Sequence, residues 1–365
     1  MIYMFFMPDH YASKIGAFFK FKVSVMSLPS PLLTALPEQL PLDQERPFQA
    51  IRLQSPIHGP RLIVTAAVHG NETCGTFAIT RLVQQFEQGE LKLKCGALTF
   101  VPVTNPKAYR LKRRNGDRNL NRRLIPTDTP VQYEDHIANW LCPLLAEHDG
   151  LLDLHSFQSG DQAFALFGPK NNQEALEPFA HAAIEEALVQ RLGCTRFVYG
   201  WLETYAKGIH RRAAEVNAGR FNAKEVDIDT RYGIGTTEYM RSVGGWSITL
   251  ECSQHDDVGG REVAYQAILN TLLHLGMLEG APPLPVEDVQ VLGLYDVYDR
   301  FDLNDQFAKQ WKSFDSIEKG EVIGTRADGT IIVAEQDCFI VFPNIKSQPG
   351  QEWFYLARAG GRLGR

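Results

Sequence analysis

The chain has 365 residues, of which 44% are hydrophobic, and it carries a formal net charge of −6 with a pI near 6.0. A chain of this length and composition can bury a large core, so we expect one large domain with a smaller one beside it. The acidic balance argues against a nucleic-acid-binding protein.

Six cysteines are scattered along the chain without any C-x-x-C pair. This spacing excludes a cysteine-rich zinc site, and in a chain of this size it indicates reduced thiols in a cytoplasmic protein. No stretch reaches the roughly 18 apolar residues of a membrane span, so we predict no membrane contact. A homo-oligomer is compatible with the sequence.

The first 25 residues are apolar only in patches, which Pro8, Asp9 and several lysines interrupt. They lack the order of basic start, apolar block and small-residue cleavage site that defines a secretory signal. We therefore interpret residues 1–25 as a non-native extension, with translation starting at Met26, and exclude them from the fold prediction.

From about Ile51 to Gly280, apolar runs typical of buried strands alternate with helical periodicity. This alternation predicts an α/β fold with a mixed, largely parallel sheet and flanking helices. The predicted elements, in chain order, are a strand at 61–68, a helix around Ile79–Phe86, strands at 96–104 and 150–154 with a helix around Ile137–Leu145 between them, a helix near 172–192, a strand at 246–251 and a helix around Val263–Leu272.

The segment 279–288, with three prolines, interrupts this pattern and is typical of a linker. Short strands separated by turns follow it, including a turn at Asp328-Gly329. We therefore predict a domain at 26–280 that carries the site and a small all-β domain at 286–365.

Polar side chains stand at the ends of four predicted strands. They are His69 with Glu72, Asn105, His155 and Glu251. In an open α/β sheet the active crevice lies outside the carboxyl ends of the strands, so these side chains are expected to meet.

Two histidines and one glutamate are the ligand set of a catalytic zinc that keeps its fourth position open. His69, Glu72 and His155 therefore predict one Zn2+ per chain. Asp153 shares the strand face of His155 and is a candidate to orient it. His255, Asp256 and Asp257 follow a strand together and could form a second metal site. Adjacent polar residues after a strand are typical of a loop, however, and we do not count them among the predicted ligands.

The segment 105–124 contains eight basic residues in an acidic protein: Lys107, Arg110, Lys112, Arg113, Arg114, Arg118, Arg122 and Arg123. It is either a solvated surface loop or a site where guanidinium groups clamp a carboxylate. Interleaved asparagines in "NLNR" favour fixed hydrogen bonding over a nucleic-acid patch, which needs aromatic residues as well.

The motifs "HGNE", "NP" followed by "RNGDRNLNR", "DLHS" and the strand-end glutamate occur here in this order. Together they resemble the succinylglutamate desuccinylase and aspartoacylase family, which belongs with the zinc carboxypeptidases. The resemblance covers about residues 55–275.

The resemblance implies zinc ligands at His69, Glu72 and His155, and a general base at Glu251 that later protonates the leaving amine. It implies that Arg114 polarises the scissile carbonyl. It also implies that Asn121 and Arg122 hold the α-carboxylate of the substrate, and that Arg241 binds a side-chain carboxylate.

This sequence departs from the family pattern at three places. Asn119 stands where aspartoacylase has an aspartate, "ECSQHDD" replaces the usual glycine after Glu251, and the β domain shows no clear counterpart of the substrate-binding tyrosine. The identity of the substrate therefore does not carry over.

The leading hypothesis is zinc-dependent hydrolysis of the linear amide bond in a small anionic N-acyl amino acid. A metallocarboxypeptidase acting on a short peptide is the nearest alternative, since the same clamp would serve it. A non-catalytic anion-binding protein is a third reading, but it leaves Glu251 and His155 unexplained. No G-x-S-x-G, P-loop or G-x-G-x-x-G motif is present.

Overall fold

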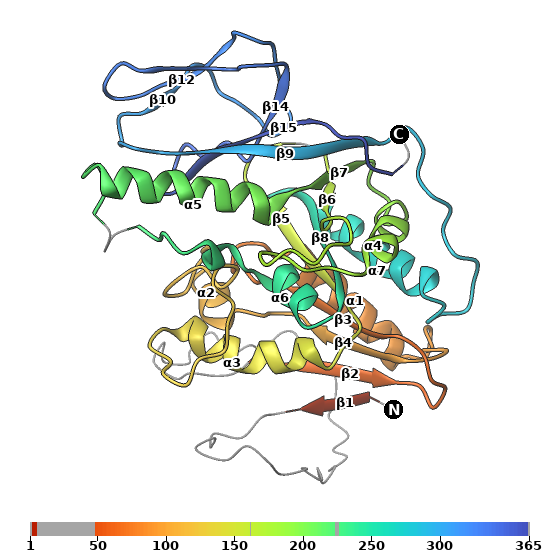
Figure 1. Ribbon diagram of the computed structural model, residues 1–365. Helices are drawn as coiled ribbons and strands as arrows, with labels where there is room; N and C mark the ends of the chain where they lie inside the picture. Colours follow the sequence, from red (N-terminus) through yellow and green to blue (C-terminus); the bar gives the residue numbers. More distant parts are fainter. Residues whose placement is uncertain (1, 6–47, 161, 223–225, 364–365) are drawn as a thin grey trace.

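A mixed β-sheet of twelve strands runs through the computed structural model, which describes residues 2–5, 48–160, 162–222 and 226–363 (Figure 1). Its strands stand in the order β1-β2-β4-β3-β5-β8-β6-β7-β9-β15-β14-β11. Their bounds are β1 (Ile2–Phe5), β2 (Ala50–Gln54), β3 (Arg61–Ala66), β4 (Ala97–Val101), β5 (Gly150–Phe157), β6 (Phe164–Leu166), β7 (Arg196–Tyr199), β8 (Trp246–Gln254), β9 (Gln290–Asp299), β11 (Ser316–Ile317), β14 (Cys338–Val341) and β15 (Glu352–Ala359).

The centre of this sheet is parallel, because β4, β3, β5 and β8 pair side by side in the same direction. Antiparallel strands extend it on both sides, and β6 enters antiparallel to β8. The predicted mixed α/β fold is confirmed. All four strands that the sequence predicts in this region are present.

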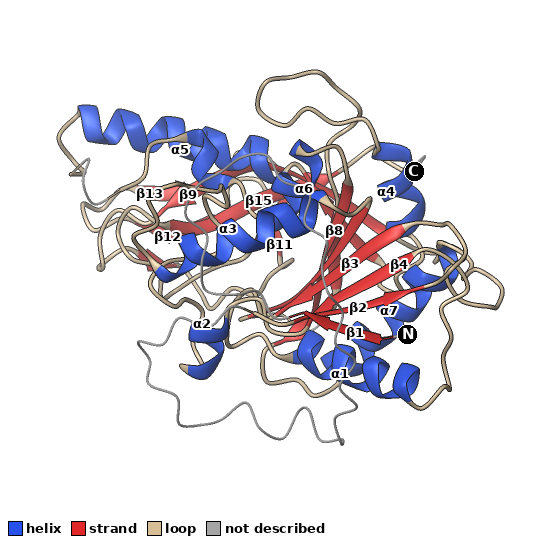
Figure 2. Cartoon of the chain, turned by 90° about the horizontal axis from the view of Figure 1, so that it is seen from below, coloured by secondary structure: helices blue, strands red, loops and turns tan. Residues whose placement is uncertain are grey.

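Helices cover both faces of the sheet (Figure 2). Alternate residues of β3 show why, since Leu62 and Val64 belong to one apolar core and Ile63 to another, as expected for a strand that is buried on both faces. The first core includes residues of α1, α4 and α7, and the second includes residues of α3 and α6. These helices span Cys74–Glu87, Ala182–Val189, Gly260–His274, Tyr133–Ala146 and Thr236–Ser242, respectively.

Helix α5 (Trp201–Asn217) was missed by the sequence reasoning, although it is the longest helix in the described residues. Leu202, Tyr205 and Ile209 are buried at helical spacing, and α5 packs against β9. Two further short elements, α2 (Pro106–Arg110) and the 3-10 helix η1 (Thr230–Gly233), were not predicted either. The helix predicted near 172–192 is present only as α4.

The C-terminal strands continue the main sheet, because β9 pairs in parallel with β7 and β15 pairs with β9. A separate three-stranded antiparallel sheet is formed by β10 (Gln306–Phe307), β12 (Val322–Thr325) and β13 (Ile331–Val333). This is the small β structure expected near the C-terminus. The division into domains at 26–280 and 286–365 stays a prediction.

Of the proposed extension at residues 1–25, the structure describes only β1, which pairs antiparallel with β2. The predicted start at Met26 lies outside the described residues. No helix in the described part of the chain is long and apolar enough to cross a membrane. The cytoplasmic location and any homo-oligomer stay predictions.

Candidate active site

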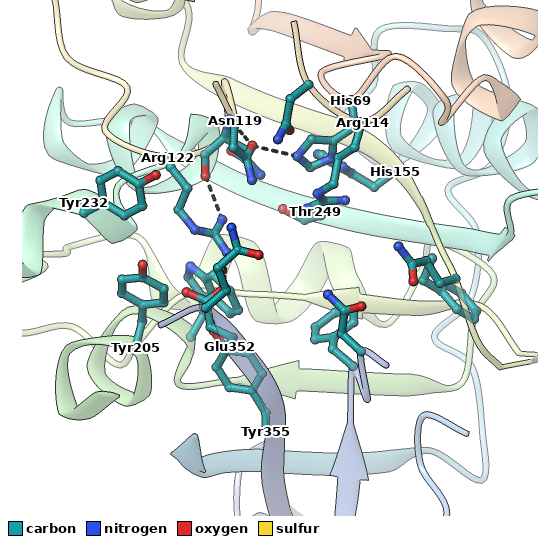
Figure 3. Close-up of a pocket in the computed structure, with 18 of the residues that line it drawn as sticks. His69, Arg114, Asn119, Arg122, His155, Tyr205, Tyr232, Thr249, Glu352 and Tyr355 are labelled. Atoms are coloured by element: carbon teal, nitrogen blue, oxygen red, sulfur yellow. Dashed lines mark hydrogen bonds and ion pairs between the residues drawn. The ribbon is translucent and has the colours of Figure 1, made fainter. Parts of the chain in front are cut away.

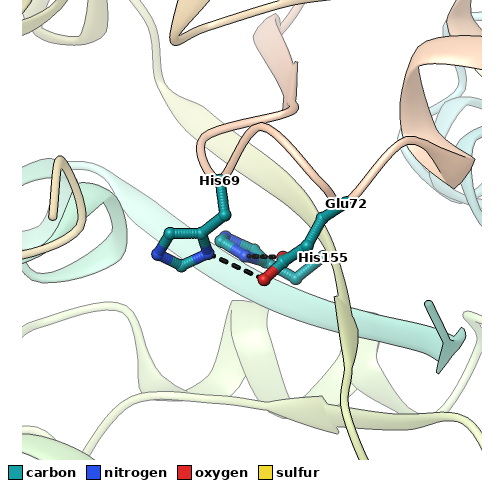
Figure 4. A group of neighbouring side chains, drawn as sticks. All are labelled: His69, Glu72 and His155. Atoms are coloured by element: carbon teal, nitrogen blue, oxygen red, sulfur yellow. Dashed lines mark hydrogen bonds and ion pairs between the residues drawn. The ribbon is translucent and has the colours of Figure 1, made fainter. Parts of the chain in front are cut away.

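Three side chains from neighbouring strand ends meet at one edge of the sheet. His69 and Glu72 stand on the turn between β3 and α1, and His155 lies in β5, which pairs in parallel with β3. One ligand atom of each residue lies within 4.8 Å of the others (Figure 4). The predicted group of His69, Glu72 and His155 is therefore brought together.

The Glu72 carboxylate lies between the two imidazole rings. Its Oε1 is 2.9 Å from Nδ1 of His69, and its Oε2 is 2.8 Å from Nδ1 of His155. All three side chains are buried, with 1–3% of their area exposed. Both Nδ1 atoms therefore face one shared point beside the carboxylate.

The other nitrogen of each ring is held by an oxygen acceptor. Nε2 of His155 lies 2.8 Å from Oδ2 of Asp153, and Nε2 of His69 lies 2.9 Å from Oδ1 of Asn119. A proton on each Nε2 leaves Nδ1 with a lone pair for a metal, which is how such partners fix ligand histidines. Asn119 thus supplies an acceptor oxygen despite replacing the family aspartate.

Electrostatics in this group favour a cation. Burial lowers the pKa of His69 to about 4, so its imidazole is neutral. Burial would also lower the pKa of His155, but Asp153 and Glu72 raise it well above the ordinary value. The two histidines hold the pKa of Glu72 well below its usual range against the effect of burial.

These residues fit a zinc ion by an observation of the structure itself. Nδ1 of His69 is buried and makes no hydrogen bond, although it lies beside Glu72. Two imidazole nitrogens and a carboxylate are the donors that Zn2+ takes in catalytic sites. Among the described residues, His255, Asp256 and Asp257 form no comparable group.

Glu251 lies beside this group on β8, opposite His155 in the parallel pair of strands. Only 9% of the residue is exposed, and its buried Oε2 has no hydrogen-bond partner in the part of the chain that the structure describes. Burial raises the pKa of this carboxyl to about 8. An unpartnered carboxylate oxygen at this position is a candidate proton acceptor.

The basic loop is positioned by a residue that the sequence reasoning missed. Glu134, at the start of α3, is fully buried and accepts hydrogen bonds from Nδ2 of Asn105 and from the backbone N–H groups of Gly116, Asp117 and Arg118. An acidic residue in the first turn of a helix is a weak sequence signal, because it usually serves the helix alone. Here it fixes the segment that carries the arginines.

The predicted residues of this loop reach the site in different ways (Figure 3). Nη1 of Arg114 donates to Oε1 of Glu72 at 2.9 Å, and the side chain is 42% exposed. Arg122 is 9% exposed and lies over the rings of Trp201 and Tyr205, with its guanidinium carbon 4.9 and 5.2 Å from their centroids. Oδ1 of Asn121 accepts from the backbone N–H of Thr236, which leaves its amide NH2 group for a ligand.

Arg241, predicted as a substrate ligand, is engaged by protein groups on every side. Its Nε donates to Glu185, its Nη1 to Glu177 and its Nη2 to the carbonyl of Ser247, each at 2.9 Å. The residue lines the cavity but is only 6% exposed. Direct binding of a substrate carboxylate by Arg241 stays a prediction, and this arrangement does not favour it.

A cavity of about 590 Å3 is lined by the predicted site residues other than Glu72 and extends to the C-terminal strands. The side chains that line it and that the sequence reasoning missed include Tyr205, Tyr232, Glu352 and Tyr355 (Figure 3). Glu352 lies with Oε2 4.0 Å from Nη2 of Arg122. The only sequence signal for Glu352 and Tyr355 is their position at opposite ends of one short aromatic run, "EWFY".

Gly70 holds the turn of His69 against α2, and we expect Gly70→Ala to be destabilising. A Cβ there would lie 2.0 Å from the backbone carbon of Ala108, and backbone atoms cannot move aside cheaply. We expect a loss of about 2 kcal/mol in the free energy of unfolding, measured by urea denaturation. Gly361→Ala is the control, because no atom lies within 4 Å of its Cβ. Equal stability of the two variants would contradict the close packing at Gly70.

A family model of the succinylglutamate desuccinylase/aspartoacylase catalytic domain matches residues 58–194. The chain is 25% identical over 301 residues to a succinylglutamate desuccinylase from Pseudomonas syringae pv. tomato, which covers 80% of this chain and 81% of that relative.

Solved structures share the fold. A succinylglutamate desuccinylase/aspartoacylase from Rhodobacter sphaeroides superposes with a TM-score of 0.62 at 17% identity, over 86% of this chain and 90% of that one. A product-bound ectoine utilization protein from Ruegeria pomeroyi gives 0.62 at 18%, over 85% and 88%. A succinylglutamate desuccinylase from Vibrio cholerae gives 0.63 at 17%, over 86% of each chain. Residues 58–194, which carry the buried His69, Glu72 and His155, thus match the catalytic domain of the succinylglutamate desuccinylase/aspartoacylase family.

Proposed function

We propose that this protein is a zinc-dependent deacylase that cleaves the amide bond of a small N-acyl amino acid with a free carboxylate. The observation that carries the proposal is one cavity that joins the His69, Glu72 and His155 group to the unpartnered Oε2 of Glu251 and to Arg122. These are a metal-ligand set, a proton acceptor and a carboxylate-binding cation, which together are what such a reaction needs.

One zinc ion held by His69, Glu72 and His155 would polarise the scissile carbonyl and make water a better nucleophile at neutral pH. Asp153 and Asn119 keep the two rings in the required orientation. Asp153 is itself fixed by the hydroxyl groups of Thr65 and Thr236, both at 2.5 Å.

Glu251 takes a proton from the attacking water and later delivers it to the nitrogen of the leaving amine. Because Glu251 is buried, bulk water is kept away from its carboxylate. Bulk water at this position would weaken proton transfer to and from the substrate. Arg114 reaches the same place from the loop and stabilises the negative charge that develops on the carbonyl oxygen.

The α-carboxylate of the substrate binds the amide NH2 group of Asn121 and the guanidinium group of Arg122. Arg122 is oriented for this role by its own hydrogen bond from Nη1 to the carbonyl of Asn121, at 2.8 Å. The rings of Trp201 and Tyr205 cover it and keep its charge away from bulk water.

A small substrate is favoured over a peptide by the walls of the cavity. The C-terminal segment from Phe342 to Asn344 and the residues from Gln348 to Glu352 line the cavity together with Arg122. A cavity of about 590 Å3 is in the range of small-molecule sites. The carboxypeptidase reading therefore ranks second, and the relatives named as desuccinylases agree with this order.

The experiment that tests this function combines metal analysis of the purified protein with a panel of N-acyl amino acids and short peptides. We expect close to one zinc per chain and release of free amino acid from the N-acyl amino acids. Cleavage of peptides alone would favour the carboxypeptidase, and tight binding of anions without any turnover would favour the anion-binding protein.

Arg122→Ala and Arg114→Ala are expected to change different kinetic constants. Arg122 contacts the substrate both before and during reaction, so its loss should raise KM by about tenfold or more. Arg114 acts on charge that develops only in the transition state, so its loss should lower kcat by about a hundredfold. Steady-state kinetics measures both. Equal hydrolysis of a free and an α-amidated substrate would contradict the carboxylate clamp.

A further inference from the structure

A recess of the cavity lies directly beside the carboxylate clamp, at the start of α6. Oδ1 of Asn121 accepts from the backbone N–H of Thr236 at 2.9 Å and from its hydroxyl at 3.3 Å. A Cβ on Gly235 would lie 2.1 Å from the same oxygen, so the backbone at Gly235 packs closely against the Asn121 side chain. Thr237 and Glu238, the two residues after Thr236, line the cavity.

The recess also borders the proposed base. Thr249 lies two residues before Glu251 on β8, so both side chains stand on one face of the strand, and both line the cavity. Glu251 itself lines this cavity, and its buried Oε2 has no hydrogen-bond partner among the described residues. An amino acid held at Asn121 by its α-carboxylate, with its amide at Glu251, therefore directs its side chain into the recess.

Arg241 offers no free edge to a ligand in this recess. Four hydrogen bonds occupy its guanidinium group: Nε and Nη2 reach Glu185 at 2.9 and 3.3 Å, Nη1 reaches Glu177, and Nη2 also reaches the Ser247 carbonyl. A guanidinium has five N–H donors, and the remaining Nη1 donor has Oε1 of Glu238 at 3.6 Å. The positive charge of Arg241 is therefore paired with carboxylates of the protein itself.

Three carboxylates share this single guanidinium. Glu185 is fully satisfied, because the backbone N–H groups of Gly168 and Ser247 also donate to it. Burial, together with the nearby Glu238, raises the pKa of Glu177 to about 7, although Arg241 lowers it. With three carboxyl groups around one guanidinium, the cluster holds a surplus of acidic groups over cations.

Glu238 presents that surplus to the cavity. Its Oε1 accepts one hydrogen bond from the Thr237 hydroxyl and its Oε2 accepts one from the Gly235 N–H, each at 2.9 Å. An ionised carboxylate can accept about four hydrogen bonds, so Glu238 retains room for a donor. A second carboxylate brought here would meet like charge in a buried place, which is strongly unfavourable.

We infer that the recess formed by Thr237, Glu238 and Thr249 is the side-chain subsite and that it selects an amino acid with a cationic, amine-bearing side chain over an acidic one. This inference rests on the proposed function, because Asn121 and Arg122 must hold the α-carboxylate for the side chain to reach the recess. It assigns Glu238 as the specificity-determining residue.

The test compares three amino acids that share three side-chain carbons and differ in charge, namely ornithine, norvaline and glutamate. Binding of the free amino acids as products is measured by isothermal titration calorimetry, and hydrolysis of their N-acetyl derivatives by kcat/KM. We expect ornithine to bind at least about tenfold more tightly than glutamate, and the N-acetyl derivatives to follow the same order. A preference for glutamate in either measurement would overturn the inference.

Glu238→Gln removes the charge but keeps an oxygen for the Gly235 N–H. We expect this variant to lose the preference for ornithine over norvaline while norvaline binding changes little. Glu262→Gln is the matched control, because that side chain is 65% exposed and is not part of the cavity lining. An unchanged ornithine-to-norvaline ratio in Glu238→Gln would overturn the assignment. Hydrolysis of none of the N-acetyl derivatives would count against the proposed function, whereas the binding preference would still decide the subsite.

Discussion

Glu251→Gln is expected to lower kcat by between about 10² and 10⁴, the range for loss of a general acid–base group. Glutamine has nearly the same shape, so the substrate and the metal should still bind, but its amide cannot accept the proton of the attacking water. The substitution should break no hydrogen bond of Oε2, because this oxygen has no hydrogen-bond partner among the described residues. Single-turnover kinetics together with metal analysis measures both properties.

The control for this variant is Glu279→Gln, whose side chain is 80% exposed and pairs with Lys94 at the surface. It should retain the activity of the unchanged protein. Simultaneous loss of activity and of the metal in Glu251→Gln would instead identify Glu251 as a ligand or as a residue required for folding.

His69→Ala is expected to remove most of the bound zinc and with it nearly all activity. Two remaining ligands, Glu72 and His155, hold zinc far less tightly than three. Zinc content after dialysis, measured by mass spectrometry, should fall from about one per chain to near zero. His58→Ala tests whether the loss is specific, since His58 is an exposed histidine eleven positions earlier in the chain. Full zinc occupancy of His69→Ala would contradict the proposed ligand set.

The sequence predicts the centre of the fold and the metal group because both depend on local patterns. Runs such as "RLIVTAAV" and "GLLDL" are apolar on both strand faces, which is a signature of a covered parallel strand. Parallel strands place their carboxyl ends together, so His69 and His155 could be expected to meet although 86 positions separate them.

The partners of the buried charges could not be predicted in the same way. Arg241 meets Glu185 and Glu177 across 56 and 64 residues, and Glu134 meets the basic loop through three backbone N–H groups. No periodicity marks such contacts, since they depend on how two loops and two helices pack. The spacing of Arg241 from Glu251 was the reason to predict the family role for Arg241. That spacing could not show that Glu185 and Glu177 already accept hydrogen bonds from its guanidinium group.

The pairing of the C-terminal strands was also beyond the sequence. The prolines of 279–288 mark a break in local structure, but they cannot show that β9 rejoins the main sheet beside β7. The short strands indicate a β structure, and only the three-dimensional arrangement brings Glu352 to Arg122.

The continuation of the sheet into β15 bears on when a newly made chain becomes active. Glu352 and Tyr355 line the cavity from that strand, and β15 is held there by pairing with β9. On a ribosome that adds about 5–20 residues per second, β3 and β5 with the candidate metal ligands are complete roughly 10–40 seconds before β15 is synthesised. During that interval the nascent chain carries the candidate metal ligands but lacks one wall of the cavity. The last strand of the main sheet to be synthesised is therefore one that lines the cavity, and a chain that ended before residue 352 would carry the three ligands without a finished cavity.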